Sequence, residues 1–145
     1  MADVTIVTDA LTAIDDAWLA EHSAASAKDK LQIAADRAEA IAWAVAMAGQ
    51  GDRLALLLHG FPESAYSWRH QMPLLAGLGY RVWAPDLRGY GETTRPPRLQ
   101  DYAIEKLMDD VAALIDASGS RAVTLIAHDW GAVIAWHFAM RRIRP

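Results

Sequence analysis

The chain has 145 residues, the size of one ordinary domain with a sizeable core. Its 14 basic and 18 acidic residues give a net charge of -4, and no cluster of Lys and Arg that would bind nucleic-acid phosphates precedes residue 141. The absence of cysteine excludes disulfides and thiolate metal sites. The first residues lack a secretory signal, and no apolar run approaches the roughly 20 residues of a membrane span. We therefore expect a cytoplasmic protein with no nucleic-acid or membrane partner, no metal and no cofactor.

Residues 1–26 are predicted to form an added helical extension to a domain of residues 27–145. Leu11, Ile14 and Trp18 recur at helical spacing. After them the periodicity changes, and the apolar segments 31–35 and 41–47 predict a β-hairpin, although their alanine content would also permit a helix.

Apolar segments separated by loops that contain glycine and proline then predict strands followed by helices. We expect buried strands at 54–58, 81–84 and 122–127, and helices at 68–75, 104–115 and 130–141. Pro73 should bend or split the first of these helices, and Gly119 should stop the second. The last helix is apolar nearly all round, so we expect it to be buried. Alternation of this kind predicts a three-layer α/β sandwich with a mostly parallel sheet.

The segment from Ala122 to Ala132 is the feature around which the remaining motifs are arranged. It predicts a strand, a tight turn and a helix, with Asp129 at the turn and small residues two positions to either side. Such an elbow presents one nucleophilic side chain at the carboxyl edge of a parallel sheet. The loops holding Phe61 and Asp86 should reach the same edge, where ligands bind in such sheets.

Four motifs in this order resemble the α/β-hydrolase fold epoxide hydrolases, over about residues 30–145. They are His59–Ser64, Tyr66–Gln71, Gly79–Gly91 and His128–Ala132. The resemblance implies a truncated α/β-hydrolase fold. The predicted hairpin and the extra N-terminal helix come from the spacing of apolar residues, and residues 1–26 lie outside the resemblance. The resemblance also implies a small apolar epoxide as substrate and its hydrolysis to a diol through an aspartyl ester.

The resemblance assigns roles to individual residues at the two turns. Asp129 would be the nucleophile, and the backbone N–H groups of Phe61 and Trp130 would form the oxyanion hole. Pro62 would follow a cis peptide bond. The turns would also be shaped by Gly60 and Gly131.

Several other residues are interpreted as structural parts of the site. His59 and His128 each precede a functional residue in a sharp turn, which favours a hydrogen-bonding role over that of a general base. Asp86 is expected to bind backbone in its own loop. The side chains of Trp68, Trp83 and Trp136 are expected to lie in the core.

The sequence departs from the resemblance after residue 145. The resemblance implies that relatives carry a helical lid there, with the tyrosines that hydrogen-bond the epoxide oxygen, followed by the catalytic acid and the histidine that activates water. We therefore expect this chain alone to be weakly active or inactive. We also expect an exposed outer edge on the nucleophile strand, to be covered by self-association or by a partner chain.

Two alternatives remain open. A haloalkane or haloacid dehalogenase uses the same aspartate, but these enzymes tend to carry asparagine where Phe61 stands or arginine where Trp130 stands. The other alternative is a non-catalytic remnant that acts as an interaction module.

Overall fold

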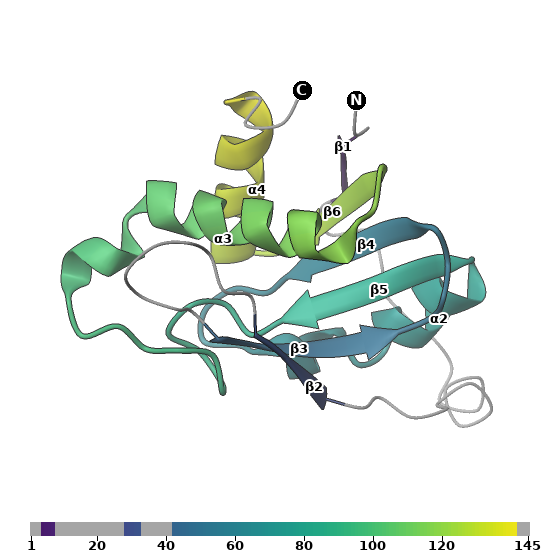
Figure 1. The fold of residues 1–145 in the computed structure, drawn as a ribbon, viewed down its shortest axis with the longest axis horizontal. Coiled ribbons are helices and arrows are strands. Elements are labelled where there is room, and N and C mark those ends of the chain that lie inside the picture. Colours follow the sequence, from purple (N-terminus) through teal and green to yellow (C-terminus); the bar gives the residue numbers. More distant parts are fainter. Residues whose placement is uncertain (1–3, 8–27, 33–41, 142–145) are drawn as a thin grey trace.

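The computed structural model describes residues 4–7, 28–32 and 42–141 as one six-stranded sheet with helices on both faces (Figure 1). The strand order is β1-β6-β4-β5-β3-β2. The elements are β1 (Val4–Val7), β2 (Lys28–Gln32), β3 (Ala42–Ala48), β4 (Arg53–Leu58), η1 (Ala65–Trp68), α2 (Gln71–Gly77), β5 (Tyr80–Pro85), η2 (Leu99–Tyr102), α3 (Ile104–Ser118), β6 (Val123–Ala127) and α4 (Trp130–Met140).

The central strand β4 divides its side chains between two cores. Leu54, Leu56 and Leu58 pack with the buried faces of α3 and α4. Ala55 and Leu57 point the other way, into a second core formed with η1 and α2. Because successive side chains of a strand face opposite sides, an unbroken apolar strand can hold a helical layer on each face. The predicted three-layer sandwich is confirmed.

Parallel pairing brings the ends of the central strands to one edge of the sheet. β4 pairs in parallel with both β5 and β6, and Leu58, the last residue of β4, is in register with Ala127, the last of β6. The segments that leave these strands therefore start from the same edge. This register places the turn after β4 beside the turn after β6.

The predicted hairpin strands are present and antiparallel, although the first begins earlier than expected. β2 starts at Lys28, and its partner β3 pairs on its other side with β5. β2 lies at the edge of the sheet. The predicted residues 33–35 lie outside the described part of the chain.

The N-terminal segment contains a strand where only helix was predicted. β1 pairs in parallel with β6, from Val4 opposite Val123 to Val7 opposite Ile126. The expected exposed outer edge on the nucleophile strand is therefore wrong, because β1 occupies it. The segment Val4-Thr-Ile-Val7 consists of β-branched residues, which favour strands. The predicted helix around Leu11–Trp18 lies outside the described residues.

Helix α4 is less buried than its composition predicts. Ile134, Ala135 and Phe138 are buried against the sheet, whereas Trp136 is 51% exposed and Met140 is 65% exposed. The prediction that this helix and Trp136 are buried is wrong on the outward face, where no described element covers it. Trp68 and Trp83 are buried, as predicted.

The helix expected at 68–75 is split into η1 and α2. The break lies at Arg69 and His70, before Pro73. Pro73 is the third residue of α2. Backbone N–H groups in the first turn of a helix have no acceptor within the helix, so the missing N–H of proline costs no hydrogen bond there. The chain therefore bends between the two helices and Pro73 fits inside the second.

Candidate active site

The turn between β6 and α4 holds Asp129 in an unusual backbone conformation. Asp129 has φ 50° and ψ -121°, and it is the one non-glycine residue with positive φ in the part of the chain that the structure describes. Such a conformation costs about 1–3 kcal/mol and is kept where the surrounding structure imposes it. The result is a sharp elbow that leaves the Asp129 side chain at the surface, immediately before α4.

Two glycines allow this elbow to approach the turn after β4. A Cβ on Gly131 would lie 2.1 Å from the Leu58 carbonyl oxygen. A Cβ on Gly60 would lie 2.4 Å from Cβ of Asp129 and 2.6 Å from its Oδ1. All three distances are far shorter than van der Waals contact, so a larger residue at either glycine would push the two turns apart.

The Asp129 carboxylate accepts a hydrogen bond from the neighbouring turn. The backbone N–H of Phe61 donates to Asp129 Oδ1 at 2.8 Å. The N–H groups of Phe61 and Trp130 both stabilise the charged form and hold the pKa of Asp129 below its ordinary value, with a smaller contribution from His128. The Phe61-Pro62 peptide bond is cis.

We call residues 59–65 the β4 turn, and its first residue, His59, is buried and bonded through both ring nitrogens. Nε2 accepts the Leu87 N–H at 2.9 Å, so Nδ1 carries the proton and donates it to the Gly60 carbonyl oxygen, also at 2.9 Å. Burial lowers the pKa of His59, which favours this neutral form. His59 therefore connects two backbone segments, and neither nitrogen is free to take a proton from substrate or water.

Asp86 begins the β5 loop, which we define as residues 86–98. Its side chain bonds in its own loop, as expected, where Oδ2 accepts the Glu92 N–H at 3.2 Å. It also reaches outside that loop, because Oδ1 accepts the Ala65 N–H at 2.8 Å. Asp86 thus joins the β5 loop to the far end of the β4 turn.

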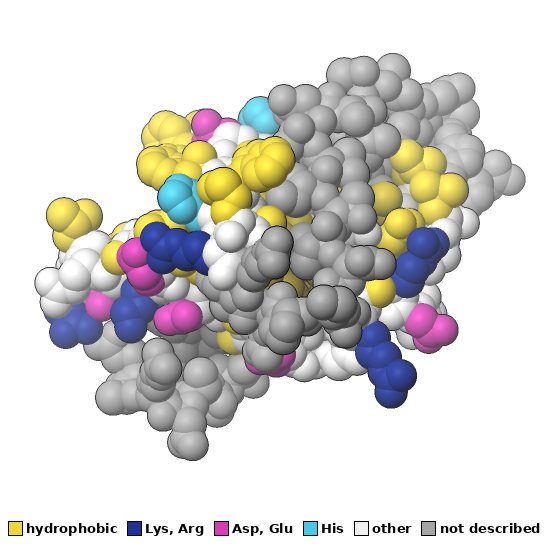
Figure 2. Space-filling view, turned by 90° about the horizontal axis from the view of Figure 1, so that it is seen from above, with side chains coloured by type: hydrophobic (Ala, Val, Ile, Leu, Met, Phe, Trp, Pro, Cys, Tyr) yellow, Lys and Arg dark blue, Asp and Glu magenta, His cyan; other side chains and the backbone are white. Residues whose placement is uncertain are grey.

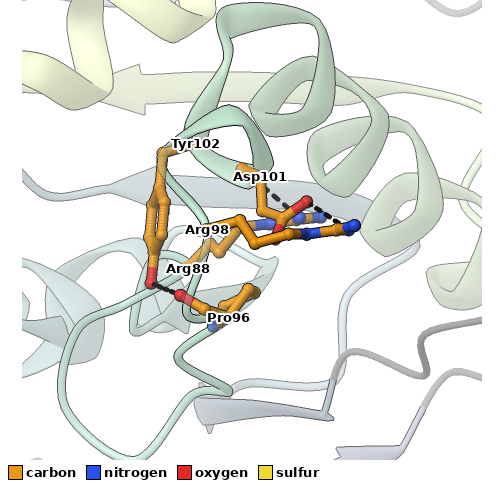
Figure 3. A network of polar contacts seen from close by, with 5 residues as sticks. All are labelled: Arg88, Pro96, Arg98, Asp101 and Tyr102. Carbon is orange, nitrogen blue, oxygen red and sulfur yellow. Dashed lines mark hydrogen bonds and ion pairs between the residues drawn. The ribbon is translucent and has the colours of Figure 1, made fainter.

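A polar network anchors the β5 loop to α3 through Asp110 and to η2 through Asp101 and Tyr102 (Figure 3). The Arg88 guanidinium is buried and forms a bidentate pair with Asp110 of α3, at 2.8 Å and 2.6 Å, while a third donor reaches the Asp101 carbonyl oxygen at 2.9 Å. Asp101 in turn pairs with Arg98, and Tyr102 donates to the Pro96 carbonyl oxygen at 2.9 Å. The loop is held along its length from Arg88 to η2.

Sequence reasoning missed one residue near the site, Tyr90. Its ring contacts His59 edge-on, with ring centroids 5.0 Å apart. Burial and the negative charge of Asp129 raise the pKa of Tyr90. The available signal was the glycine on either side of it, which marked the loop but not the direction of the ring.

The surroundings of the Asp129 carboxylate are open and apolar. The neighbouring side chains of Phe61 and Trp130 are 66% and 53% exposed, and Val133, one turn into α4, is 40% exposed. Figure 2, which views the molecule from above, shows hydrophobic side chains gathered beside histidine and acidic side chains on that face. The arrangement combines a charged carboxylate with surface that suits an apolar ligand.

Within residues 4–7, 28–32 and 42–141, no group of three or more His, Cys, Asp or Glu side chains lies close enough together to bind a metal ion. Among the helices in those same ranges, none has the length and apolar character needed to cross a bilayer.

Comparison with known proteins confirms the resemblance expected from the motifs. Epoxide hydrolase 2 of Siraitia grosvenorii is 48% identical over 98 residues, covering 68% of this chain and 31% of that protein. Epoxide hydrolase B of Mycobacterium tuberculosis is 52% identical over 86 residues, or 59% of this chain and 24% of that protein. The chain therefore spans about a third or less of the length of these relatives.

The solved structures agree with the sequence relatives. An epoxide hydrolase from Vigna radiata superposes with a TM-score of 0.72 at 45% identity, covering 79% of this chain and 35% of that one. The family model described as the alpha/beta hydrolase fold matches residues 55–145, which is more than half of the chain and includes both turns of the site. On sequence, sheet order and site geometry together, the chain belongs to the alpha/beta hydrolase fold family.

Proposed function

We propose that the site carries out epoxide hydrolysis, with Asp129 as the nucleophile. The observation that carries the proposal is the hydrogen bond from the Phe61 N–H to Asp129 Oδ1. It occupies one carboxylate oxygen and leaves Oδ2 for attack. The relatives named above are epoxide hydrolases, which supports an epoxide as the electrophile.

In the first step, Asp129 Oδ2 attacks a ring carbon of the epoxide. A C–O bond forms to the enzyme, the ring C–O bond breaks, and the alkoxide takes a proton from water at this exposed carboxylate. The product is an ester between Asp129 and the opened substrate. The low pKa of Asp129 keeps the carboxylate charged, as nucleophilic attack requires.

In the second step, water attacks Cγ of the ester and gives its proton to a base. Negative charge then develops on Oδ1, which already accepts the Phe61 N–H, and the Trp130 N–H stabilises charge on the same carboxylate. The Cγ–Oδ2 bond then breaks, the proton held by the base passes to the leaving oxygen Oδ2, and the neutral diol is released. His59 cannot serve as the base, because both of its ring nitrogens are engaged. We therefore expect the ester to accumulate on this chain.

The proposed substrate is a small apolar epoxide. The exposed side chains of Phe61, Trp130 and Val133 offer apolar contacts around the carboxylate. We also propose a cytoplasmic location, on the absence of cysteine in the sequence.

Self-association is proposed on a different surface from the one first expected. Since β1 covers the outer edge of β6, the apolar side chains on the outward face of α4 are the surface that supports it. These are Val133, Trp136 and Met140, which recur on one side of the helix.

Intact-mass measurement after incubation with styrene oxide tests the proposed chemistry. The expected result is a mass increase of one whole epoxide, because ring opening expels no leaving group. Asp129→Asn should abolish the adduct, whereas Asp52→Asn, an exposed aspartate away from the site, should keep it.

Two outcomes would contradict the proposal. An unmodified wild-type mass at high epoxide concentration would favour a non-catalytic module. Halide release from a haloalkane, with formation of the corresponding alkyl ester in place of an epoxide adduct, would favour a dehalogenase.

A further inference from the structure

The β4 turn is held at both ends by two consecutive residues of the β5 loop. At its start, the Leu87 N–H donates to His59 Nε2 at 2.9 Å. At its end, the Ala65 N–H donates to Asp86 Oδ1 at 2.8 Å. Phe61 lies between these two attachment points, so its N–H direction depends on both.

The Asp86 carboxylate is enclosed and fully used. Asp86 is only 3% exposed, and its second oxygen accepts the Glu92 N–H at 3.2 Å. The backbone at Gly91 passes so close that a Cβ there would meet the carboxylate directly. The same carboxylate therefore bonds to the β4 turn through Ala65 and to the β5 loop through Glu92.

The β5 loop is itself fixed to the rest of the fold on two sides. On the sheet side, Thr93 Oγ1 donates to the Asp86 carbonyl oxygen at 2.6 Å and accepts the Ala44 N–H of β3 at 3.0 Å. On the helix side, Arg88 is paired with Asp110 of α3, and Figure 3 shows Arg88 beside the Arg98, Asp101 and Tyr102 contacts. The β5 loop is therefore fixed to both β3 and α3, so that it can hold the β4 turn in place.

We propose that Asp86 is a positioning residue for the reaction, which aims the Phe61 N–H at Asp129 Oδ1 by holding the far end of the β4 turn. The inference rests on the proposed function, in which that N–H stabilises the ester oxygen. Asp86 touches neither substrate nor the reacting atoms, and it acts through Ala65 and the turn.

Asp86→Asn is the sharpest substitution, because it keeps the shape and changes one acceptor into a donor. An amide can accept from Ala65 or from Glu92, but its NH2 group then faces the other N–H, so one bond must be lost. Asp52→Asn makes the same chemical change at an exposed site and is the matched control. Circular dichroism and urea unfolding establish that each variant is folded.

Nuclear magnetic resonance then measures the Phe61 amide resonance and the pKa of Asp129 without requiring any reaction. In Asp86→Asn we expect the Phe61 amide resonance to move and the pKa of Asp129 to rise towards its ordinary value, with neither change in Asp52→Asn. Where the ester forms, hydroxylamine should cleave it about 10-fold more slowly in Asp86→Asn. That is less than the 100- to 1,000-fold typical of losing an oxyanion donor outright.

The outcomes separate this inference from the proposed function. A folded Asp86→Asn with an unchanged Phe61 amide and an unchanged Asp129 titration would overturn the positioning role, even if epoxide alkylation occurs. Failure of wild type to form an ester, together with the expected resonance changes, would overturn the epoxide chemistry alone.

A second variant and a wild-type measurement cover the case in which Asp86→Asn does not fold. His59→Gln loosens the opposite end of the β4 turn and should produce the same two resonance changes. In wild type, the Ala65 and Leu87 amides should both exchange hydrogen slowly. Exchange of the Ala65 amide as fast as that of an exposed loop residue would exclude the proposed attachment.

Discussion

Helices α3 and α4 pack side by side on the same face of the sheet, yet their outward faces differ. α3 buries Val111 and Leu114 and presents charged residues such as Glu105 to water. α4 buries Ile134 and Phe138 equally well, but its outward face carries apolar side chains, including Trp136. The composition of α3 matches its surroundings in this structure, whereas the outward face of α4 has the composition of a covered surface.

This difference bears on the site, because α4 begins directly after Asp129. The inner face of α4, together with Gly131, sets the position of the elbow against β4. The outward side chains of Trp136 and Met140 are exposed and do not belong to the buried cluster that joins α4 to β4. Stability and site geometry should therefore depend on the inner faces of both helices, while association should depend on the outer face of α4 alone.

The largest effect is expected on the buried faces. Phe138→Ala in α4 should lower the free energy of unfolding by about 3–5 kcal/mol, and Leu114→Ala in α3 by about 2–5 kcal/mol, because each leaves a cavity in one shared core. Urea unfolding measures both. A loss below about 1 kcal/mol for Phe138→Ala alone would mean that α4 is not packed as the inner face of α3 is.

A smaller effect is expected where α4 meets β4. Gly131→Ala places a methyl group 2.1 Å from the Leu58 carbonyl oxygen, so the backbone must shift. We expect a loss of about 1–3 kcal/mol, despite the better helix propensity of alanine. Ester formation at Asp129 should fall as well. Equal or greater stability in thermal unfolding would show that the two turns do not approach this closely.

The pH dependence of stability reports on His59. Its pKa is lowered by burial, so below its ordinary value of 6.5 the unfolded chain binds a proton that the folded chain excludes. The contribution of neutral His59 to the free energy of unfolding should be fully present above pH 6.5. It should decrease as the pH falls from 6.5 towards the pKa of His59 in the folded chain, by at most about 1.4 kcal/mol per pH unit. His59→Gln should remove this part of the slope. Urea unfolding between pH 5 and 7.5 compares wild type with this variant. Identical slopes of unfolding free energy against pH would refute the buried neutral form of His59.

The smallest effect on stability is expected on the outward face of α4. Trp136→Gln and Met140→Gln should change the free energy of unfolding by no more than about 0.5 kcal/mol, because these side chains are exposed. They should reduce self-association in light scattering. Lys106→Gln on the exposed side of α3 is the matched control and should leave association unchanged. Association that persists in the double variant would place the contact elsewhere.

Local spacing was sufficient to predict most elements and the sheet edge at which the candidate residues meet. The apolar run of β4, the stripe of α3 ending before Gly119, and the strand-turn-helix pattern around Asp129 all depend on neighbouring residues. Parallel pairing then brings Phe61, Asp86 and Asp129 to one edge of the sheet, as the topology rules predict. The resemblance supplied the roles of Phe61, Trp130 and Asp129, and these stay predictions until the mass measurement is made.

Tertiary structure alone decided the remaining features, because each depends on residues far apart in sequence. The local sequence of Val4–Val7 does not predict its pairing with β6, and the apolar composition of α4 does not predict which of its faces is covered. The same holds for Asp86, whose local loop bond was predictable but whose bond to Ala65 was not. Spacing along the chain specifies what an element is, whereas its partners are set by which surfaces the completed fold brings into contact.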